Sequence, residues 1–368
     1  MVIPGKGINQ FWSAPTREGI DQYVEKYVLL KQTNSNLHVV CTALTEAIQP
    51  SENIQYLVEQ FNKHQIKLTI LANSYIQRWA KELKKLNCNI VYLDYFLWRV
   101  YNEVEINKTN DVNPQWNPAA NKFLFLTGKP DKPNRVRLLW KLYQNNLLDR
   151  AIWSLFINSY NTQAAHKQVP ELDDNEFDQF VNQFNSNPDQ IEVIQKPHMD
   201  LHYPGLPYDY TLFQRTKFRL IAETDMRYTV PWITEKTWLT ILNKHPFILA
   251  GDVGVCKKLQ EMGFKTFNNY LKIPDYDLIE DIDQRLDAIV INVNYLLCDP
   301  IDRTAINNDI QHNYHHLIEL GKQNQNKITN FFSNLHISTE KIDQFITSKD
   351  IIQIEHQLGI DYTKGKKL

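Results

Sequence analysis

The stretch KFRLIAETDMRYTVPWITEKTWLTILNKHPFILAGDVGVCKKLQEMGFKTF, residues 217–267, establishes the fold class. KFRLIAE is an apolar run typical of a strand, and the spacing of apolar residues in EKTWLTILNK predicts a helix that begins after Thr234. PFILAG predicts a second short strand, and VGVCKKLQEMG predicts a helix closed by Gly263. This alternation indicates a parallel sheet with crossover helices.

Polar residues gather where these strands end. Glu223 follows the first strand, Gly251 follows the second, and the TEK string at 234–236 begins the helix between them. In open parallel sheets, ligands bind outside the carboxyl ends of the strands, and a helix N-terminus attracts anions. We therefore expect a site here for a diphosphate and a sugar or ribose hydroxyl. The alternative interpretation is an ordinary acidic helix start beside a solvated lysine.

The strings ETD, WITEKTW and PFILAGD resemble the donor-binding motif of the α1,3-fucosyltransferases, glycosyltransferase family 10. That family shows F-E-N-S, then Y-V-T-E-K, then an apolar strand of the P-V-V-x-G kind. The TEK string, Thr234, Glu235 and Lys236, matches directly, and Glu223 matches the glutamate of F-E-N-S. Thr224 stands where the family has asparagine and Trp232 where it has tyrosine, and both positions lie near the nucleotide sugar in the family.

The resemblance implies the GT-B architecture, in which two Rossmann-like α/β domains face each other across a cleft. We expect an acceptor-side domain over residues 1–155, a crossing segment over 156–210, a nucleotide-sugar domain over 211–300, and C-terminal helices over 301–368 that pack back across the first domain. The implied reaction is inverting, metal-independent transfer of a sugar to a hydroxyl acceptor such as a glycan. GDP-fucose is the family's donor, and the chain looks closer to phage and bacterial relatives with no assigned sugar.

A basic turn precedes the helix predicted over NRVRLLWKLYQNNLL, residues 134–148. Asn134 is the expected N-cap of this helix. The loop and first turn hold Lys129, Lys132, Arg135 and Arg137, where the helix dipole disfavours cations, which indicates an anionic ligand. In family 10 an arginine before an aromatic helix contacts the donor diphosphate. The resemblance assigns this role to Arg135, with Arg137 as the alternative, and planar guanidinium groups suit phosphate oxygens. Since Arg135 falls before residue 155, domain closure would be part of catalysis. A solvated basic turn is the other interpretation.

Strand and helix patterns before residue 100 predict the first α/β domain. Glu46 follows the strand predicted over LHVVCTAL, and Asp94 follows the strand within NIVYLDYF. Either carboxylate is a candidate for the general base that deprotonates the acceptor hydroxyl. Ordinary loop carboxylates are the alternative for both.

Composition and residue spacing restrict the kinds of partner, metal site and cofactor that we expect. The 368 residues suffice for two domains, and the net charge of −2 gives no electrostatic basis for nucleic acid as a main partner. Scattered cysteines, no D-x-D string after an apolar strand, and no third ligand beside His312 and His316 predict no metal site and no cofactor beyond the nucleotide-sugar substrate. The residues expected to be structural, forming a turn with helix capping and an ion pair, are Tyr276, Asp277, Asp281 and Arg285.

The sequence shows no apolar run of about 18 residues and no leader, so we expect no membrane span and a cytoplasmic location. Two other functions stay open. One is a phage-type transferase that decorates nucleic-acid bases or a protein, and the other is an inactive GT-B module that only binds its ligand. The sequence does not address the oligomeric state.

Overall fold

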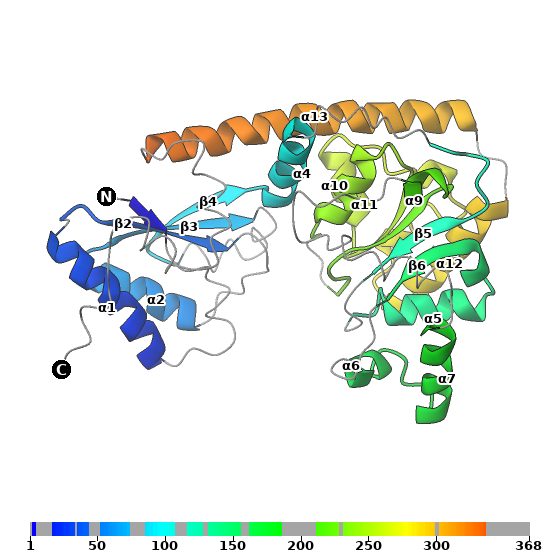
Figure 1. Cartoon of the computed structure of the whole chain (residues 1–368), viewed down its shortest axis with the longest axis horizontal. Helices are drawn as coiled ribbons and strands as arrows, with labels where there is room; N and C mark the ends of the chain where they lie inside the picture. The colour runs from blue at the N-terminus through cyan, green and yellow to red at the C-terminus, as the bar shows by residue number, and fades with distance from the viewer. Residues whose placement is uncertain are drawn as a thin grey trace. The chain divides into compact units, whose positions relative to one another are not determined.

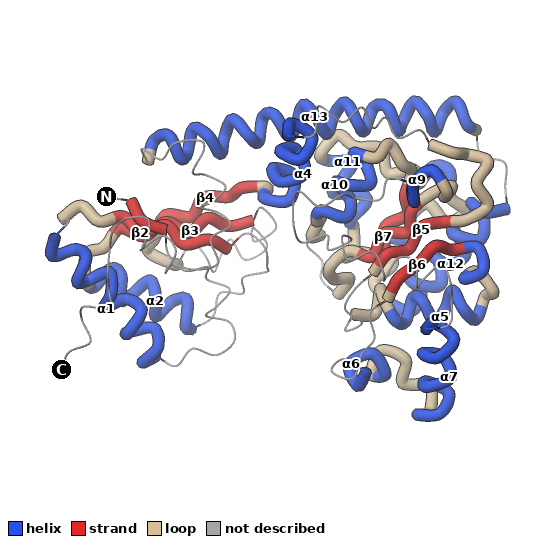
Figure 2. Tube along the Cα trace, in the orientation of Figure 1, coloured by secondary structure: helices blue, strands red, loops and turns tan. Residues whose placement is uncertain are grey.

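The computed structural model (Figures 1 and 2) describes residues 2–4, 17–33, 35–43, 52–73, 85–106, 116–127, 132–155, 162–185, 211–227, 231–298 and 302–335. The chain divides into two compact units, residues 1–98 with 323–368, and residues 99–322. Each unit contains a four-stranded sheet, and every strand pairing between neighbours is parallel. The predicted α/β class with parallel sheets is therefore confirmed.

The first unit has its strands in sequential order, β1 (Val2–Pro4), β2 (His38–Ala43), β3 (Lys67–Asn73) and β4 (Asn89–Leu93). Right-handed crossovers in such a sheet place the connecting helices on one face. Helices α1 (Arg17–Thr33) and α2 (Glu52–Lys63) pack together there, with the rings of Tyr23 and Tyr27 against Phe61.

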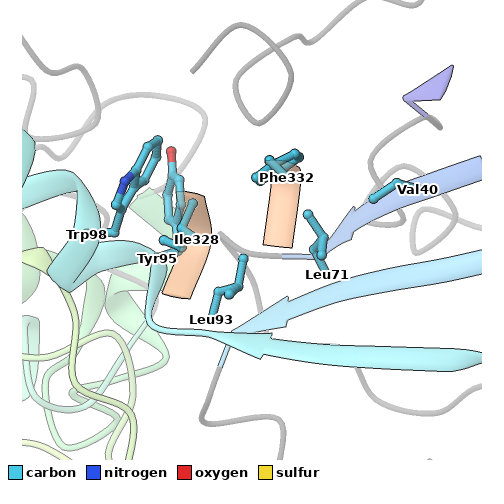
Figure 3. Packing of buried hydrophobic residues seen from close by; sticks show 7 residues of the cluster. All are labelled: Val40, Leu71, Leu93, Tyr95, Trp98, Ile328 and Phe332. Atoms are coloured by element: carbon cyan, nitrogen blue, oxygen red, sulfur yellow. The ribbon is translucent and has the colours of Figure 1, made fainter. Parts of the chain in front are cut away.

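The end of α13 (Arg303–Asn334) packs on this sheet, together with the start of α4 (Tyr95–Ile106). Figure 3 shows the buried cluster that joins them, formed by Val40, Leu71, Leu93, Tyr95, Trp98, Ile328 and Phe332. Because strand side chains alternate between faces, Val40 meets α13 while Cys41 lies 3.8 Å from the Tyr23 hydroxyl of α1. The expectation that a C-terminal helix packs back on the first domain is met by this end of α13.

The second unit has a different strand order, β6-β5-β7-β8. The strands are β5 (Phe123–Leu126), β6 (Ala151–Ser154), β7 (Arg219–Ala222) and β8 (Phe247–Ala250). All are buried along their whole length, as expected for parallel strands covered on both faces. The chain moves from β5 to β6 through α5 (Val136–Gln144) and from β7 to β8, in the opposite direction, through α10 (Glu235–Leu242).

The order of connections therefore reverses between β5 and β7. Right-handed crossovers place α5 and α10 on opposite faces of the sheet, as Figure 1 also shows. The other described elements of this unit are η3 (Leu148–Arg150), α6 (Thr162–His166), α7 (Asp174–Asn185), α9 (Thr211–Gln214), α11 (Val255–Glu261), η4 (Asn268–Tyr270), η5 (Tyr276–Leu278) and α12 (Ile282–Cys298). Within the described residues, no helix is long and apolar enough to cross a membrane.

The predicted division at residue 155 differs from this arrangement. β5 pairs with β7 through Leu124 and Arg219, so residues 123–154 belong to the same sheet as the central stretch. A strand and helix pattern predicts the presence of each element, but sheet membership depends on pairings between residues about a hundred positions apart, which no local pattern contains. The GT-B arrangement of the two units is an expectation that these observations leave untested.

Candidate functional site

The segments that follow β5 and β7 meet at the carboxyl edge of the second sheet. The buried Asn134 donates from Nδ2 to the carbonyl of Glu223 at 2.7 Å and to that of Ala250 at 2.9 Å. Lys132 Nζ lies 3.8 Å from Asp225 Oδ2. In doubly wound sheets the reversal of strand order is where ligands bind, so this edge is the candidate site.

Asn134 was expected to cap the following helix, and the structure corrects this. Helix α5 instead starts after Arg135, whose side chain makes no cap hydrogen bond. Asn134 is drawn away because its amide donates to two main-chain carbonyls at the ends of β7 and β8. The Ala250 carbonyl also accepts the Glu223 N–H at 3.0 Å, so the Asn134 amide is its second donor. Its side chain thus fixes the start of α5 against the strand ends.

Glu223 is a buried carboxylate that caps α10. Its oxygens accept hydrogen bonds from the Thr234 N–H at 3.1 Å, the Thr234 hydroxyl at 2.5 Å and the Thr237 hydroxyl at 2.5 Å. Thr234 is the N-cap residue, as predicted, but makes no side-chain cap bond of its own. The anion at this helix start is therefore Glu223, so a bound phosphate would meet the side chain of Lys236 rather than the Thr234 N–H.

Glu235 and Lys236 form an ordered pair at the first turn of α10. Lys236 Nζ lies 2.9 Å from Glu235 Oε1 and 3.1 Å from the Thr234 hydroxyl. The Lys236 side chain is 13% exposed. This contradicts the interpretation of Lys236 as a solvated lysine, because a cation that is mostly covered and held by two oxygens has a fixed position.

The two arginines of the α5 turn have different surroundings. Arg137 is paired with Asp283 of α12, with its Nε and one terminal nitrogen each 2.6 Å from a carboxylate oxygen. The pair holds one hydrogen bond, from the terminal nitrogen, and a close Nε–Oδ1 ion pair. It ties α5 to α12 and gives no support to the phosphate contact suggested for Arg137. Arg135 directly follows the anchored Asn134 and lies in the same unit as Glu223, so the expected dependence on domain closure is not needed to bring it to this edge.

Three further predicted donor contacts lie at the same strand ends. Trp232 is 7% exposed, so only a small part of its ring is accessible for stacking, and its backbone N–H donates to Asp252 Oδ2 at 3.2 Å. Thr224 is partly exposed after Glu223. A Cβ on Gly251 would lie 3.4 Å from Glu223 Cβ, which is ordinary contact, so the site does not require glycine there.

The residues expected to be structural do hold the edge together. Tyr276 accepts at its hydroxyl from the Leu249 N–H at 2.9 Å, and Asp277 accepts from the Cys256 N–H at 2.9 Å at the start of α11. Asp281 accepts from the Gln284 N–H at 2.9 Å at the start of α12. These bonds confirm the prediction of a turn with capping.

Arg285, from the same motif, lies beneath the loop after β7. It is buried and donates to the carbonyls of Ile279, at 2.7 Å, and Met226. Burial lowers the pKa of Arg285, and the carboxylates of Asp252 and Asp277 act in the opposite direction. Arg285 is structural, as predicted, but it binds main-chain carbonyls where the sequence suggested an ion pair. The Met226 carbonyl, 59 positions away, could not be predicted from the sequence.

Asp225 is a residue of this edge that the sequence analysis did not select. It is buried, and it accepts from the N–H groups of Met226 at 2.9 Å and Arg227 at 3.2 Å. Arg227 also donates from Nε to Asp225 at 2.7 Å. Burial raises the pKa of Asp225, but the hydrogen bonds and charge of Arg227, with Lys132, outweigh it and hold the pKa below its usual value.

The structure describes one of the two candidate general bases, Asp94, which belongs to the first unit. Asp94 follows β4 in the first unit, accepts from the Leu97 N–H at 3.2 Å, and so caps α4. Burial raises the pKa of Asp94 to about 6, although the Leu97 hydrogen bond acts against this. Glu46 and Lys129 lie outside the described residues.

For His312 and His316 the sequence favours a solvated helix face over a metal pair, and His312 is indeed exposed while His316 is partly buried. Both also bind main-chain carbonyls. Their Nε2 atoms lie 2.9 Å from the carbonyl of Gly263 and 2.6 Å from that of Met262, at the end of α11. Carbonyls at a helix end need donors, and two histidines one turn apart on α13 supply them. In the described part of the chain, no group of three His, Cys, Asp or Glu residues is placed to hold a metal ion.

Comparisons with protein-family models, with curated proteins and with solved structures found no match. The resemblance to glycosyltransferase family 10 therefore rests on the motif residues of the central stretch and on Arg135.

Proposed function

We propose that this chain is a glycosyltransferase that moves a sugar from a nucleoside-diphosphate donor to a hydroxyl acceptor with inversion. The observation that supports it best is that two segments predicted to bind the nucleotide sugar meet where the strand order reverses, between β5 and β7. These segments contain Arg135, beside Asn134, and Glu223. They are separated by about ninety positions, yet the Asn134 amide joins them directly. This edge is the usual ligand position in such sheets.

The chemistry follows from the residue types. The acceptor oxygen attacks the anomeric carbon while a carboxylate takes its proton, and the bond from that carbon to the diphosphate oxygen breaks. The electron pair leaves with the diphosphate, whose growing negative charge Arg135 and Lys236 would stabilise. Glu235, fixed by Lys236, would accept hydrogen bonds from donor hydroxyls. Of the two candidate bases, Asp94 is the one within the described residues. Its pKa of about 6 suits proton transfer near neutral pH.

The test is release of nucleoside diphosphate from a panel of GDP-fucose, GDP-mannose, UDP-glucose and UDP-galactose, with and without a glycan acceptor. We expect one donor to be turned over, and Arg135→Gln and Lys236→Ala to lower kcat about a hundredfold or more. Lys258→Gln, which changes an exposed lysine of α11, is the matched control and should behave as the parent. Binding of a nucleotide sugar without any turnover would instead identify an inactive binding module, and turnover unaffected by both variants would overturn the proposed site.

A further inference from the structure

A buried carboxylate holds two cations at the candidate site. Asp225 binds Arg227 through Nε at 2.7 Å and a terminal nitrogen at 2.5 Å, and Lys132 Nζ lies 3.8 Å away. The Asp225 side chain is 8% exposed, whereas those of Arg227 and Lys132 are 44% and 22% exposed. The anion is thus covered while both cations reach the solvent, so the group presents positive charge outward.

The position of this group coincides with the switch of strand order. Asp225 and Arg227 follow β7, and Lys132 lies two residues before Asn134, whose amide reaches the carbonyl of Glu223. Arg285 donates to the Met226 carbonyl, between Asp225 and Arg227, and so supports the loop from beneath. The two cations are therefore fixed from both segments that form the candidate site.

We propose that Lys132 and Arg227 form a second anion subsite, which takes a phosphate group of the nucleoside diphosphate, and that Asp225 is the positioning residue for both. This inference rests on the proposed function and extends its charge stabilisation beyond Arg135 and Lys236. A guanidinium has five N–H donors, and Asp225 orients two of them, which directs the rest of the planar group. Ordering long cationic side chains in advance reduces the entropy lost when the ligand binds.

Asp225 could affect anion binding in either of two opposite directions. As a nearby negative charge it would weaken the binding of any anion by simple Coulomb repulsion. As a positioning residue it strengthens binding, because Lys132 and Arg227 lose their orientation without it. The two roles therefore predict opposite signs for the change in affinity when the charge is removed by Asp225→Asn.

The experiment titrates the full chain with inorganic pyrophosphate by calorimetry. We expect Arg227→Gln and Lys132→Gln each to raise the Kd about tenfold, as the loss of one charge-assisted contact does. Asp225→Asn should also raise the Kd, although it makes the site more positive. Lys258→Gln, the exposed cation on α11, should leave the Kd unchanged. Each variant's melting temperature is measured first. Lys132→Gln, which leaves Asp225 and its bonds to Arg227 in place, tests the subsite if Asp225→Asn does not fold.

A lower Kd in Asp225→Asn would overturn the positioning role of Asp225. The subsite itself would be overturned by an unchanged Kd in both Arg227→Gln and Lys132→Gln, or by a parent protein that binds no pyrophosphate. The assay of nucleoside diphosphate release separates a failure of the subsite from a failure of the proposed function. Sugar transfer with unchanged KM in Arg227→Gln and Lys132→Gln overturns the subsite alone. Pyrophosphate binding that depends on Arg227, in a parent that turns over no nucleotide sugar, supports the subsite and overturns the proposed function.

Discussion

Two carboxylates follow strands of the two sheets, and they differ in what surrounds them. Glu223, after β7, is buried and accepts one N–H and two hydroxyl hydrogen bonds. Asp94, after β4, is only partly buried and accepts the Leu97 N–H. Both cap a helix start, but Glu223 has three donors on its carboxylate oxygens, whereas the Asp94 carboxylate has one, the Leu97 N–H at 3.2 Å. A strand-end carboxylate is therefore committed to structure or available for proton transfer according to how many donors the fold supplies.

The largest expected effect is the loss of stability when the Glu223 carboxylate is replaced, compared with replacement of Asp94. Glu223→Gln replaces an acceptor of three hydrogen bonds by an amide whose NH₂ faces donors. We expect the free energy of unfolding to fall by about 3 kcal/mol, because bonds to a buried charge are lost and donors remain unsatisfied. Urea unfolding at pH 7 measures this, with Asp94→Asn as the matched variant. A loss below about 0.5 kcal/mol would show that Glu223 does not hold α10.

Asp94→Asn sharpens the comparison through its pH dependence. Folding raises the pKa of Asp94 from 3.8 to about 6, so the folded state binds more protons between these values. Stability from this group is present at low pH and is lost as the pH rises through about 6. Between pH 4.5 and 8 the parent should lose about 2 kcal/mol relative to Asp94→Asn, which does not ionise. Parallel unfolding curves at both pH values would contradict a raised pKa.

The two arginines of the α5 turn give a smaller contrast. Arg135→Gln should weaken nucleoside diphosphate binding about tenfold with little change in stability. Arg137→Gln should leave that affinity unchanged and lower the free energy of unfolding by about 1 kcal/mol, because it breaks the ion pair with Asp283. Calorimetric titration and urea unfolding of both variants check this, and an affinity loss in Arg137→Gln would restore it as a phosphate contact.

The smallest effect concerns two glycines. Gly251→Ala should change stability by less than about 0.5 kcal/mol, since its Cβ would make ordinary contacts. Gly263 has φ of +95°, and a Cβ there would lie 2.6 Å from His316 Nε2, so Gly263→Ala should cost about 1 kcal/mol or more. Thermal melts of both variants measure the difference, and equal melting temperatures would refute the distinction.

The sequence predicted individual strands and helices better than it predicted which sheet each strand joins. Strands such as FLFL and FILA and the N-cap at Thr234 follow from local pattern and are confirmed. The sequence did not reveal that residues 123–154 join the second sheet, because strand pairing is a long-range property. Asp94 was expected to follow a strand, which is confirmed, but the sequence did not reveal that it caps α4.

The candidate site shows the same limit. Arg135, Glu235 and Lys236 could be selected from residue type and resemblance, and the structure brings their segments to one edge. Asn134 and Asp225 were missed as site residues because their roles depend on partners about ninety residues away, Glu223 for Asn134 and Lys132 for Asp225. An acidic residue two positions before an arginine, as in Asp225 and Arg227, was the available local signal.

The central claim, that the β5–β7 edge binds a nucleoside diphosphate, is tested most directly by calorimetric titration of GDP and UDP into the parent, Lys236→Ala and Lys258→Gln. The account predicts that the parent and Lys258→Gln bind one of these nucleotides with equal Kd, and that Lys236→Ala binds it at least about tenfold more weakly. Equal affinity in Lys236→Ala, or no binding of either nucleotide by the parent, would contradict it.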